Sequence, residues 1–117
     1  MNALAGSAQV FLVLGATDMR KAIDGLSIMV AARLALDPLS GGYFVFCNRG
    51  RNIIKALYWD RNGFCLWQKR LERDRFHWPA SEAEVMAIGG RELSWLLEGL
   101  DLRQVQGHRK AQYSRII

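Results

Sequence analysis

The chain has 117 residues, of which 50% are hydrophobic and 23% charged, as is typical of one folded domain. Two cysteines (Cys47, Cys65) and two histidines (His77, His108) argue against a disulfide framework and against a finger-type zinc site. No apolar run approaches the ~20 residues of a membrane span, and the N-terminus does not resemble a secretory signal. We therefore expect a soluble, cytoplasmic protein that contacts no membrane.

The charge balance is basic. Sixteen Lys and Arg residues stand against eleven Asp and Glu residues, which gives a formal net charge of +5. A small basic protein favours an anionic partner, most often a nucleic acid.

The N-terminal third predicts one strand and one helix. The apolar run 10–14 indicates a short buried strand. Apolar residues at helical spacing then predict an amphipathic helix over 19–34, about five turns long. Thr17 or Asp18 can cap its first turn, and Asp37 before a proline stops it.

The middle of the chain predicts a hairpin. Residues 43–47, 53–59 and 64–71 have the composition of strands, and Asn62-Gly63 is a tight-turn signal. The spacing places Lys55 and Trp59 on one face of the hairpin with Phe64 and Gln68.

The C-terminal third adds short elements. Residues 75–78 and 85–88 are candidate strands, 91–98 a second helix, and Gly99 its stop signal. The sequence therefore predicts an α+β domain over 1–102: an antiparallel β-meander with one long helix packed on a face and a short C-terminal helix. A basic C-terminal tail over 103–117 follows.

Half of the sixteen cations lie within the 27 residues from 49 to 75, interleaved with aromatic side chains. Cations on a twisted sheet can neutralise phosphates, and aromatic rings can stack on bases. The alternative is an ordinary solvated sheet over an aromatic core. The predicted nucleic-acid-binding residues of this segment are Arg49, Arg51, Lys55, Arg61, Lys69, Arg70, Arg73 and Arg75.

A second candidate site is the pair Arg20 and Lys21, in the first turn of the predicted helix. Cations beside free helical amides form a phosphate pocket. Alternatively, Asp18 and Asp24 neutralise the pair locally.

Catalytic chemistry has little support. Asp18, Asp24, Asp60, Glu72 and Asp74 show no spacing that requires a metal centre, and each has a simple role as a cap, turn former or ion-pair partner. No glycine loop for phosphates is present, and both cysteines lie in apolar strands. We therefore predict no catalytic residues, no metal and no cofactor.

Five segments resemble one family, the TnpB accessory proteins of the IS-66 insertion sequences, which are unrelated to the RNA-guided nucleases of that name. The segments are 15–25 (GATDMRKAIDG), 37–46 (DPLSGGYFVF), 53–73 (IIKALYWDRNGFCLWQKRLER), 76–79 (FHWP) and 96–101 (LLEGLD). Departures from the family pattern occur at 22–23, Gly42 and Gln68.

The resemblance implies a small protein encoded beside a transposase and needed for transposition. We expect a non-catalytic accessory protein of DNA transposition that binds DNA, or the transposase–DNA complex, through the basic aromatic sheet. The alternative is an interaction subunit that contacts the transposase without binding DNA. A homo-oligomer is also possible.

Overall fold

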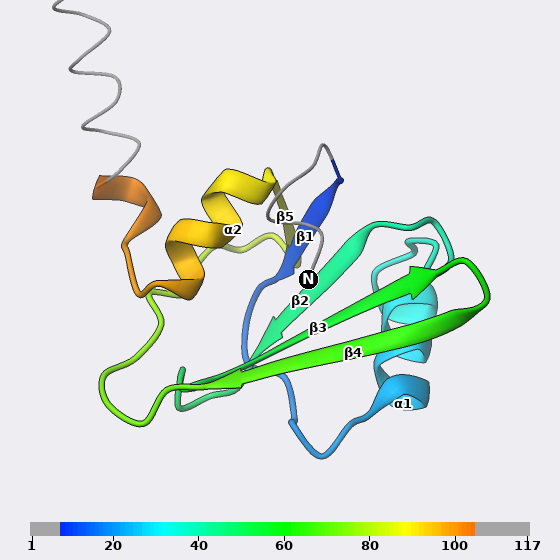
Figure 1. Ribbon diagram of the computed structural model, residues 1–117, viewed down its shortest axis with the longest axis horizontal. Coiled ribbons are helices and arrows are strands. Elements are labelled where there is room, and N and C mark those ends of the chain that lie inside the picture. The colour runs from blue at the N-terminus through cyan, green and yellow to red at the C-terminus, as the bar shows by residue number, and fades with distance from the viewer. Residues whose placement is uncertain (1–7, 105–117) are drawn as a thin grey trace, which may run out of the picture.

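The computed structural model describes residues 8–104 and has the predicted α+β class (Figure 1). Five strands form one sheet in the order β4-β3-β2-β1-β5. The strands are β1 (Val10–Val13), β2 (Tyr43–Cys47), β3 (Ile53–Asp60), β4 (Gly63–Arg70) and β5 (Val85–Ile88). The helical elements are α1 (Ile23–Ile28), a π-helical continuation η2 (Met29–Arg33) and α2 (Gly90–Leu97).

The sheet is mixed, so the predicted purely antiparallel arrangement is wrong for one strand pair. β2, β3 and β4 form the predicted meander, and β5 pairs antiparallel with β1. However, β1 pairs in parallel with β2, with Val10 opposite Tyr43. A parallel pair needs a crossover connection, and the segment containing α1 and η2 supplies it.

The hairpin register is confirmed. Lys55 lies opposite Gln68, and Trp59 lies opposite Phe64. The two-residue turn is Arg61-Asn62, because Asp60 pairs with Gly63. The left-handed backbone conformation falls on Arg61, with φ of 54°, and not on the glycine.

The first helix is shorter than predicted at its start. It begins at Ile23, and neither Thr17 nor Asp18 caps it. The backbone N–H of Arg20 donates to the Asp18 carboxylate (2.9 Å), so this segment forms a local turn. Its other end also differs, because Ala35 adopts a left-handed φ of 55° before the predicted stop at Asp37.

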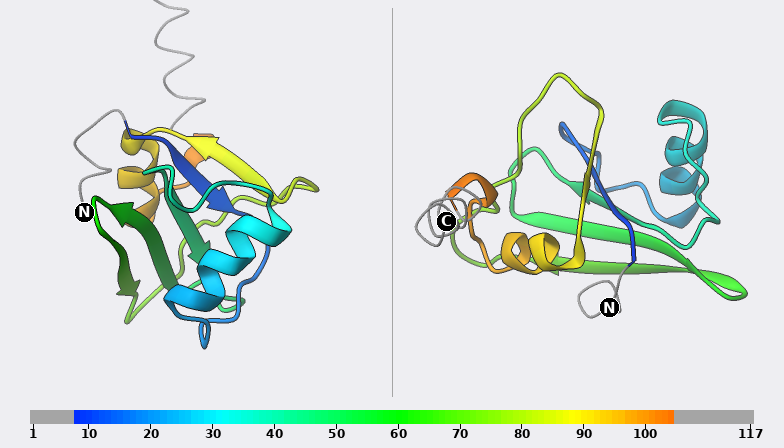
Figure 2. Two further views of the ribbon diagram at one scale, coloured as in Figure 1. Left: turned by 90° about the vertical axis from the view of Figure 1, so that its right-hand side faces the viewer. Right: turned by 90° about the horizontal axis from the view of Figure 1, so that it is seen from above.

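Each face of the sheet is covered by different elements. Alternate strand residues, such as Phe44 and Phe46, pack with Leu26 of α1 and Val30 of η2. Their neighbours Tyr43, Val45 and Cys47 pack on the opposite side with α2. Figure 2 shows α1 and α2 on opposite sides of the twisted sheet.

The segment 75–78 is not a strand, contrary to the prediction. Phe76 and Trp78 are nonetheless buried, and both join the cluster that packs beneath α2. The Trp78 indole N–H donates to the Val13 carbonyl (3.2 Å). The alternating apolar pattern therefore marks burial of every second side chain, without the ladder hydrogen bonds of a strand.

The second helix follows the prediction more closely. It ends at Leu97, and Gly99 has a left-handed φ of 89° that terminates it. Residues Leu102–Gln104 form a helical turn. The rest of the predicted tail, 105–117, lies outside the described residues. Within residues 8–104, neither helix has the length and apolarity that a membrane crossing requires.

Lys55 is a buried cation at the centre of β3, with 9% of its surface exposed. Its ammonium group donates to the carbonyl oxygens of Met19 (2.8 Å) and Lys21 (2.9 Å). These two bonds attach the segment before α1 to the face of the sheet. They also explain why the helix starts late, because those carbonyls point toward Lys55.

We expect Lys55→Met to lower the free energy of unfolding by about 1–3 kcal/mol, because it leaves two carbonyls without their charged donor. Urea denaturation followed by tryptophan fluorescence measures the change. Lys21→Met is the matched control, since that side chain is exposed and its loss should change stability by less than about 0.5 kcal/mol. Equal losses in both variants would contradict an anchoring role for Lys55.

Candidate nucleic-acid interface

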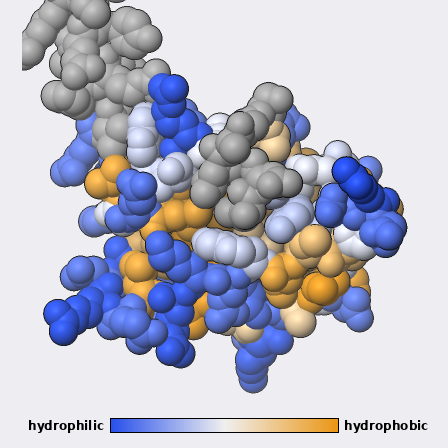
Figure 3. Space-filling model, viewed as in Figure 1, coloured by the Kyte–Doolittle hydropathy of each residue, from blue (hydrophilic) through white to orange (hydrophobic). Residues whose placement is uncertain are grey.

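Three connections meet at one end of the sheet. The strands β1 and β2 run in parallel, so both end there, and β3 begins and β4 ends at the same place. The connections are 14–22, 48–52 and 71–84. In Figure 3, hydrophilic side chains gather at the lower left, over the loops at this end.

Backbone hydrogen bonds join two of these loops. The N–H of Leu71 donates to the Asn52 carbonyl (2.8 Å), and the N–H of Phe76 donates to the Arg51 carbonyl (2.7 Å). The turn before β3 is itself closed by the Asn48 side chain, which accepts from the backbone N–H of Ile53 (3.0 Å). The two loops are therefore held in a defined relative position.

Four exposed arginines, which we call the basic end, project from these two loops: Arg49, Arg51, Arg73 and Arg75. None of the four forms a salt bridge with any residue in the range 8–104. Side chains of this kind keep their guanidinium donors available for an anionic partner. The basic end is therefore the strongest candidate for phosphate contacts among the predicted residues.

The predicted anion pocket at Arg20 and Lys21 has a different geometry. Both residues precede α1, so they are not in its first turn. The Arg20 guanidinium forms a forked pair with Asp18 (2.7 Å from Nη2), one of the two carboxylates named in the alternative, and Asp24 forms no salt bridge within residues 8–104. The hydrogen bonds from the Arg20 side chain are the main reason that the pKa of the Asp18 carboxyl is lowered from 3.8 to about 2. Arg20 is therefore neutralised locally by Asp18, as the alternative interpretation of this pair expects.

Both lysines on the hairpin bind backbone carbonyls. Lys55 is buried, as described above. Lys69 is half-buried, and its ammonium group donates to the carbonyl of Leu97 (2.9 Å), the last residue of α2. A cation at a helix C-terminus satisfies a free carbonyl and complements the helix dipole. Both lysines therefore have structural roles and are omitted from the basic end.

The remaining two predicted residues lie apart from the basic end in other ways. Arg70 pairs with Glu72 (3.1 Å), and both side chains are exposed. Arg61 occupies the hairpin turn, at the opposite end of β3 and β4. Ten predicted residues thus separate into one group of four and several individual positions.

The aromatic side chains also separate from the cations. Tyr58 and Trp67 pack against the cluster under α2, and Tyr58 contacts Tyr43 with ring centroids 4.4 Å apart. Trp59 and Phe64 meet edge to face (5.0 Å) beside the hairpin turn. The interleaving seen in the sequence therefore does not produce one surface of rings and cations.

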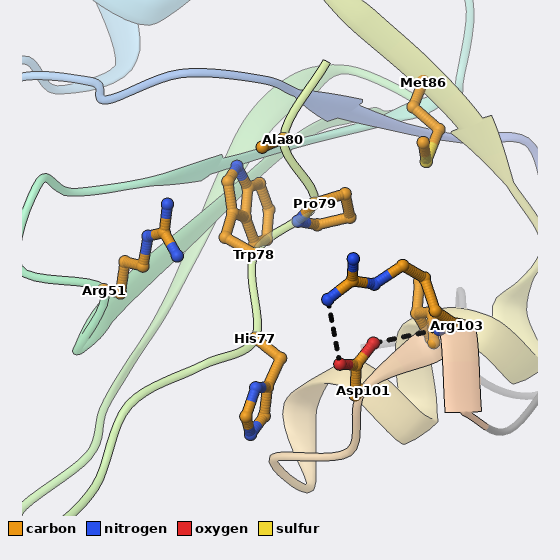
Figure 4. Close-up of a pocket in the computed structure, with 9 residues that line it drawn as sticks. Arg51, His77, Trp78, Pro79, Ala80, Met86, Asp101 and Arg103 are labelled. Atoms are coloured by element: carbon orange, nitrogen blue, oxygen red, sulfur yellow. Dashed lines mark hydrogen bonds and ion pairs between the residues drawn. The ribbon is translucent and has the colours of Figure 1, made fainter.

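Sequence reasoning missed a pocket beside the basic end. It has a volume of about 260 Å³, and its walls include Arg51, Trp78, Pro79, Asp101 and Arg103 (Figure 4). The sequence places Arg103 in the basic tail and predicts a strand for the segment of Trp78. The tryptophan-proline pair within a basic segment was the available signal, but nothing in the sequence indicated its proximity to Arg103.

Nothing in the described part of the chain indicates a catalytic centre. Within residues 8–104, no three His, Cys, Asp or Glu side chains come together in a way that could hold a metal ion. Burial raises the pKa of the Cys47 thiol to about 11, so it stays protonated at neutral pH. Both cysteines are free of disulfides in this structure.

The fold and the arginine cluster describe a small basic protein without an evident catalytic centre among its described residues. Its sequence matches a family model for insertion-sequence proteins over residues 8–107. The chain belongs to this family, described as IS66 Orf2 like protein.

Two relatives come from Sinorhizobium fredii (strain NBRC 101917 / NGR234). One, named uncharacterized protein y4hO, is 41% identical over 100 residues, covering 86% of this chain and 87% of the relative. The other, named uncharacterized protein y4jC, is 33% identical over 89 residues and covers 76% of each chain. No solved structure shows significant similarity to the chain.

The Asp18–Arg20 pair makes a pH-dependent prediction. We expect the Asp18 carboxyl to titrate near pH 2 in an NMR titration, and nearer to 3.8 in Arg20→Gln. A carboxyl with a lowered folded pKa contributes stability above its unfolded pKa and loses it as pH falls toward 2. Lys21→Gln is the control and should move the midpoint less, because Lys21 acts on the carboxylate only as a nearby charge, whereas Arg20 is hydrogen-bonded to it. A larger shift in Lys21→Gln than in Arg20→Gln would contradict the pairing.

Proposed function

We propose that the chain is a non-catalytic accessory protein of DNA transposition that binds DNA through the basic end. The observation that carries this proposal is the group of four exposed arginines without salt-bridge partners in residues 8–104. The loops that bear them are fastened to each other through the Arg51 and Asn52 carbonyls. The family supports a role in transposition.

Arginines suit this role for a physical reason. Each guanidinium presents donors in a fork that matches phosphate oxygens, and each neutralised phosphate releases counterions. Contacts of this kind set affinity and position on the duplex, and they do not read base sequence. We therefore propose a sequence-independent contribution from the basic end, with the transposase as a second partner on the same DNA.

The packing of the aromatic face supports DNA over the alternative of a transposase contact alone. Tyr58 and Trp67 are partly covered by the cluster under α2, so they do not form a bare ring surface. Within the described sheet β4 pairs only with β3 and β5 only with β1, so a second copy of the chain would add at one of these two outer edges. We propose a cytoplasmic location, where element DNA and transposase are both present.

Binding to a blunt duplex should fall steeply with salt. Each phosphate contact adds about 0.9 to the slope of log affinity against log salt, so replacing all four arginines of the basic end with glutamine should lower the slope by up to about 3–4. Fluorescence anisotropy at several salt concentrations measures this slope for the wild-type protein and for the variant.

Arg51→Gln and Arg61→Gln form a matched pair for the same measurement. Both arginines are exposed and both have left-handed backbones, with φ of 58° and 54°, so the substitutions carry the same backbone cost. Arg51→Gln should lower the slope by about one unit, and Arg61→Gln should leave it unchanged. Equal effects would remove the basic end from the site and favour diffuse attraction by net charge.

The proposal also predicts that the purified protein does not cut DNA. With magnesium or manganese, blunt duplex and single-stranded DNA should remain intact over hours on a denaturing gel. The exposed carboxylate of Asp74, between two arginines of the basic end, is the group best placed to contradict this. Metal-dependent cleavage that is lost in Asp74→Asn, with DNA affinity retained, would show that the protein is a nuclease.

A further inference from the structure

The pocket beside the basic end is formed by segments far apart in the chain. Trp78, Pro79 and Ala80 follow the basic loop, Met86 comes from β5, and Asp101 and Arg103 follow α2. In Figure 4, Arg51 lies on one side of Trp78, and the Arg103 side chain extends toward Pro79 from the other. The pocket combines an apolar wall with charged groups at its sides.

The apolar wall is held in place before any ligand binds. Trp78 is 6% exposed, and its indole N–H is bound to the Val13 carbonyl of β1. Phe76, two residues before Trp78, is also buried, and its backbone N–H donates to the Arg51 carbonyl. A ligand at this wall would not have to order the indole ring, which lowers the entropic cost of binding.

The charged side of the pocket retains free donors. The Arg103 side chain is 92% exposed, and it contacts the Asp101 carboxylate through Nη2 at 3.4 Å. The Arg103 backbone N–H also donates to that carboxylate, at 3.0 Å. A guanidinium has five N–H donors, so most of those of Arg103 stay available. The pKa of Asp101 is lowered by its bonds to Arg103, so the carboxylate remains an acceptor at neutral pH.

We propose that this pocket holds one nucleotide, with its base against Trp78 and Pro79 and its phosphate on Arg103. The inference rests on the proposed DNA binding and names the part of the DNA that the pocket takes. A volume of about 260 Å³ lies just below the range of ~300–1,000 Å³ for drug-sized ligands, so the pocket has room for no more than one nucleotide. Inorganic phosphate would use the guanidinium but leave the apolar wall uncovered.

A base inside a duplex cannot reach such a wall, because it is stacked and paired. Enzymes and binding proteins that hold a base in a pocket take it unstacked or from a single strand. The pocket should therefore favour DNA with an unpaired end over a blunt duplex. A free mononucleotide has the same chemistry and is the other possible source of the ligand.

The test compares a blunt duplex with the same duplex carrying a three-nucleotide overhang, by fluorescence anisotropy at one salt concentration. Because Trp78 is only 6% exposed, we expect the lower end of the range for base stacking, which is about 5-fold tighter binding of the overhang. Competition by dAMP distinguishes the two sources of the ligand. If dAMP at millimolar concentration or below reduces the affinity for the overhang DNA to that for the blunt duplex, a free nucleotide also binds in the pocket.

Two variants locate the effect. Ala80→Phe fills the pocket from an exposed position, and Arg103→Gln removes the guanidinium at its side. Each should abolish most of the overhang advantage, and Ala80→Phe should leave blunt-duplex affinity unchanged. The control Arg73→Gln, in the basic end but outside this pocket, should weaken both DNAs by the same factor.

The outcomes separate the two proposals. Equal affinity of the wild-type protein for both DNAs, or an overhang advantage that survives both pocket variants, overturns the nucleotide pocket and leaves DNA binding by the basic end intact. Binding to the overhang and to dAMP, without binding to the blunt duplex, supports the pocket and contradicts the proposed role of the basic end. Binding to none of the three overturns both.

Discussion

The parallel pairing of β1 with β2 is the constraint on which the rest of this structure depends. Two parallel neighbours in sequence must be joined by a segment that returns along the sheet, and here that segment contains α1 and η2. It covers one face of the sheet, while α2 covers the other. The same pairing brings the ends of β1 and β2 together with the end of β4. The surface available for a partner is therefore concentrated in the loops at that end.

The cations of this chain serve two purposes, and the division follows side-chain chemistry. Lys55 and Lys69 turn inward and donate to backbone carbonyls, one before α1 and one at the end of α2. A compact ammonium on a flexible stem can approach carbonyl oxygens end-on, whereas the planar guanidinium is suited to forked contacts with anions. The arginines of the basic end remain exposed.

The structural lysines also affect the electrostatics of the basic end. The C-terminus of α2 lies at the same end of the sheet, and its partial negative charge would oppose the approach of phosphates. Lys69 binds the terminal carbonyl of Leu97 and offsets that charge. Beyond the helix, the Asp101 carboxylate is paired with Arg103. The positive potential of the arginines is thus less opposed by the elements around them, which supports the proposed interface.

Local patterns in the sequence were sufficient for the five strands that form and for the hairpin, but not for the segment 75–78 or for the start of the first helix. Alternation and the Asn62-Gly63 signal predicted the β3–β4 register, because side-chain period and turn length are local properties. All four arginines of the basic end belong to the set predicted from charge spacing, and their contact with DNA stays a prediction. The family resemblance was carried by contiguous motifs and is confirmed by the match over residues 8–107.

The sequence did not reveal the pairing partner of β1, the late start of α1 or the roles of Lys55 and Lys69. Each depends on a contact between distant segments: a strand ladder, or an ammonium group reaching a carbonyl 28 to 36 residues away. The pocket between Trp78 and Arg103 has the same origin. Sequence by itself determined the five strands and the approximate position of both helices, and it determined where the cations lie along the chain, although it also predicted a strand at 75–78 that does not form. Only the tertiary structure decided which cations are free, because a side chain keeps its charge available only where folding brings it no partner.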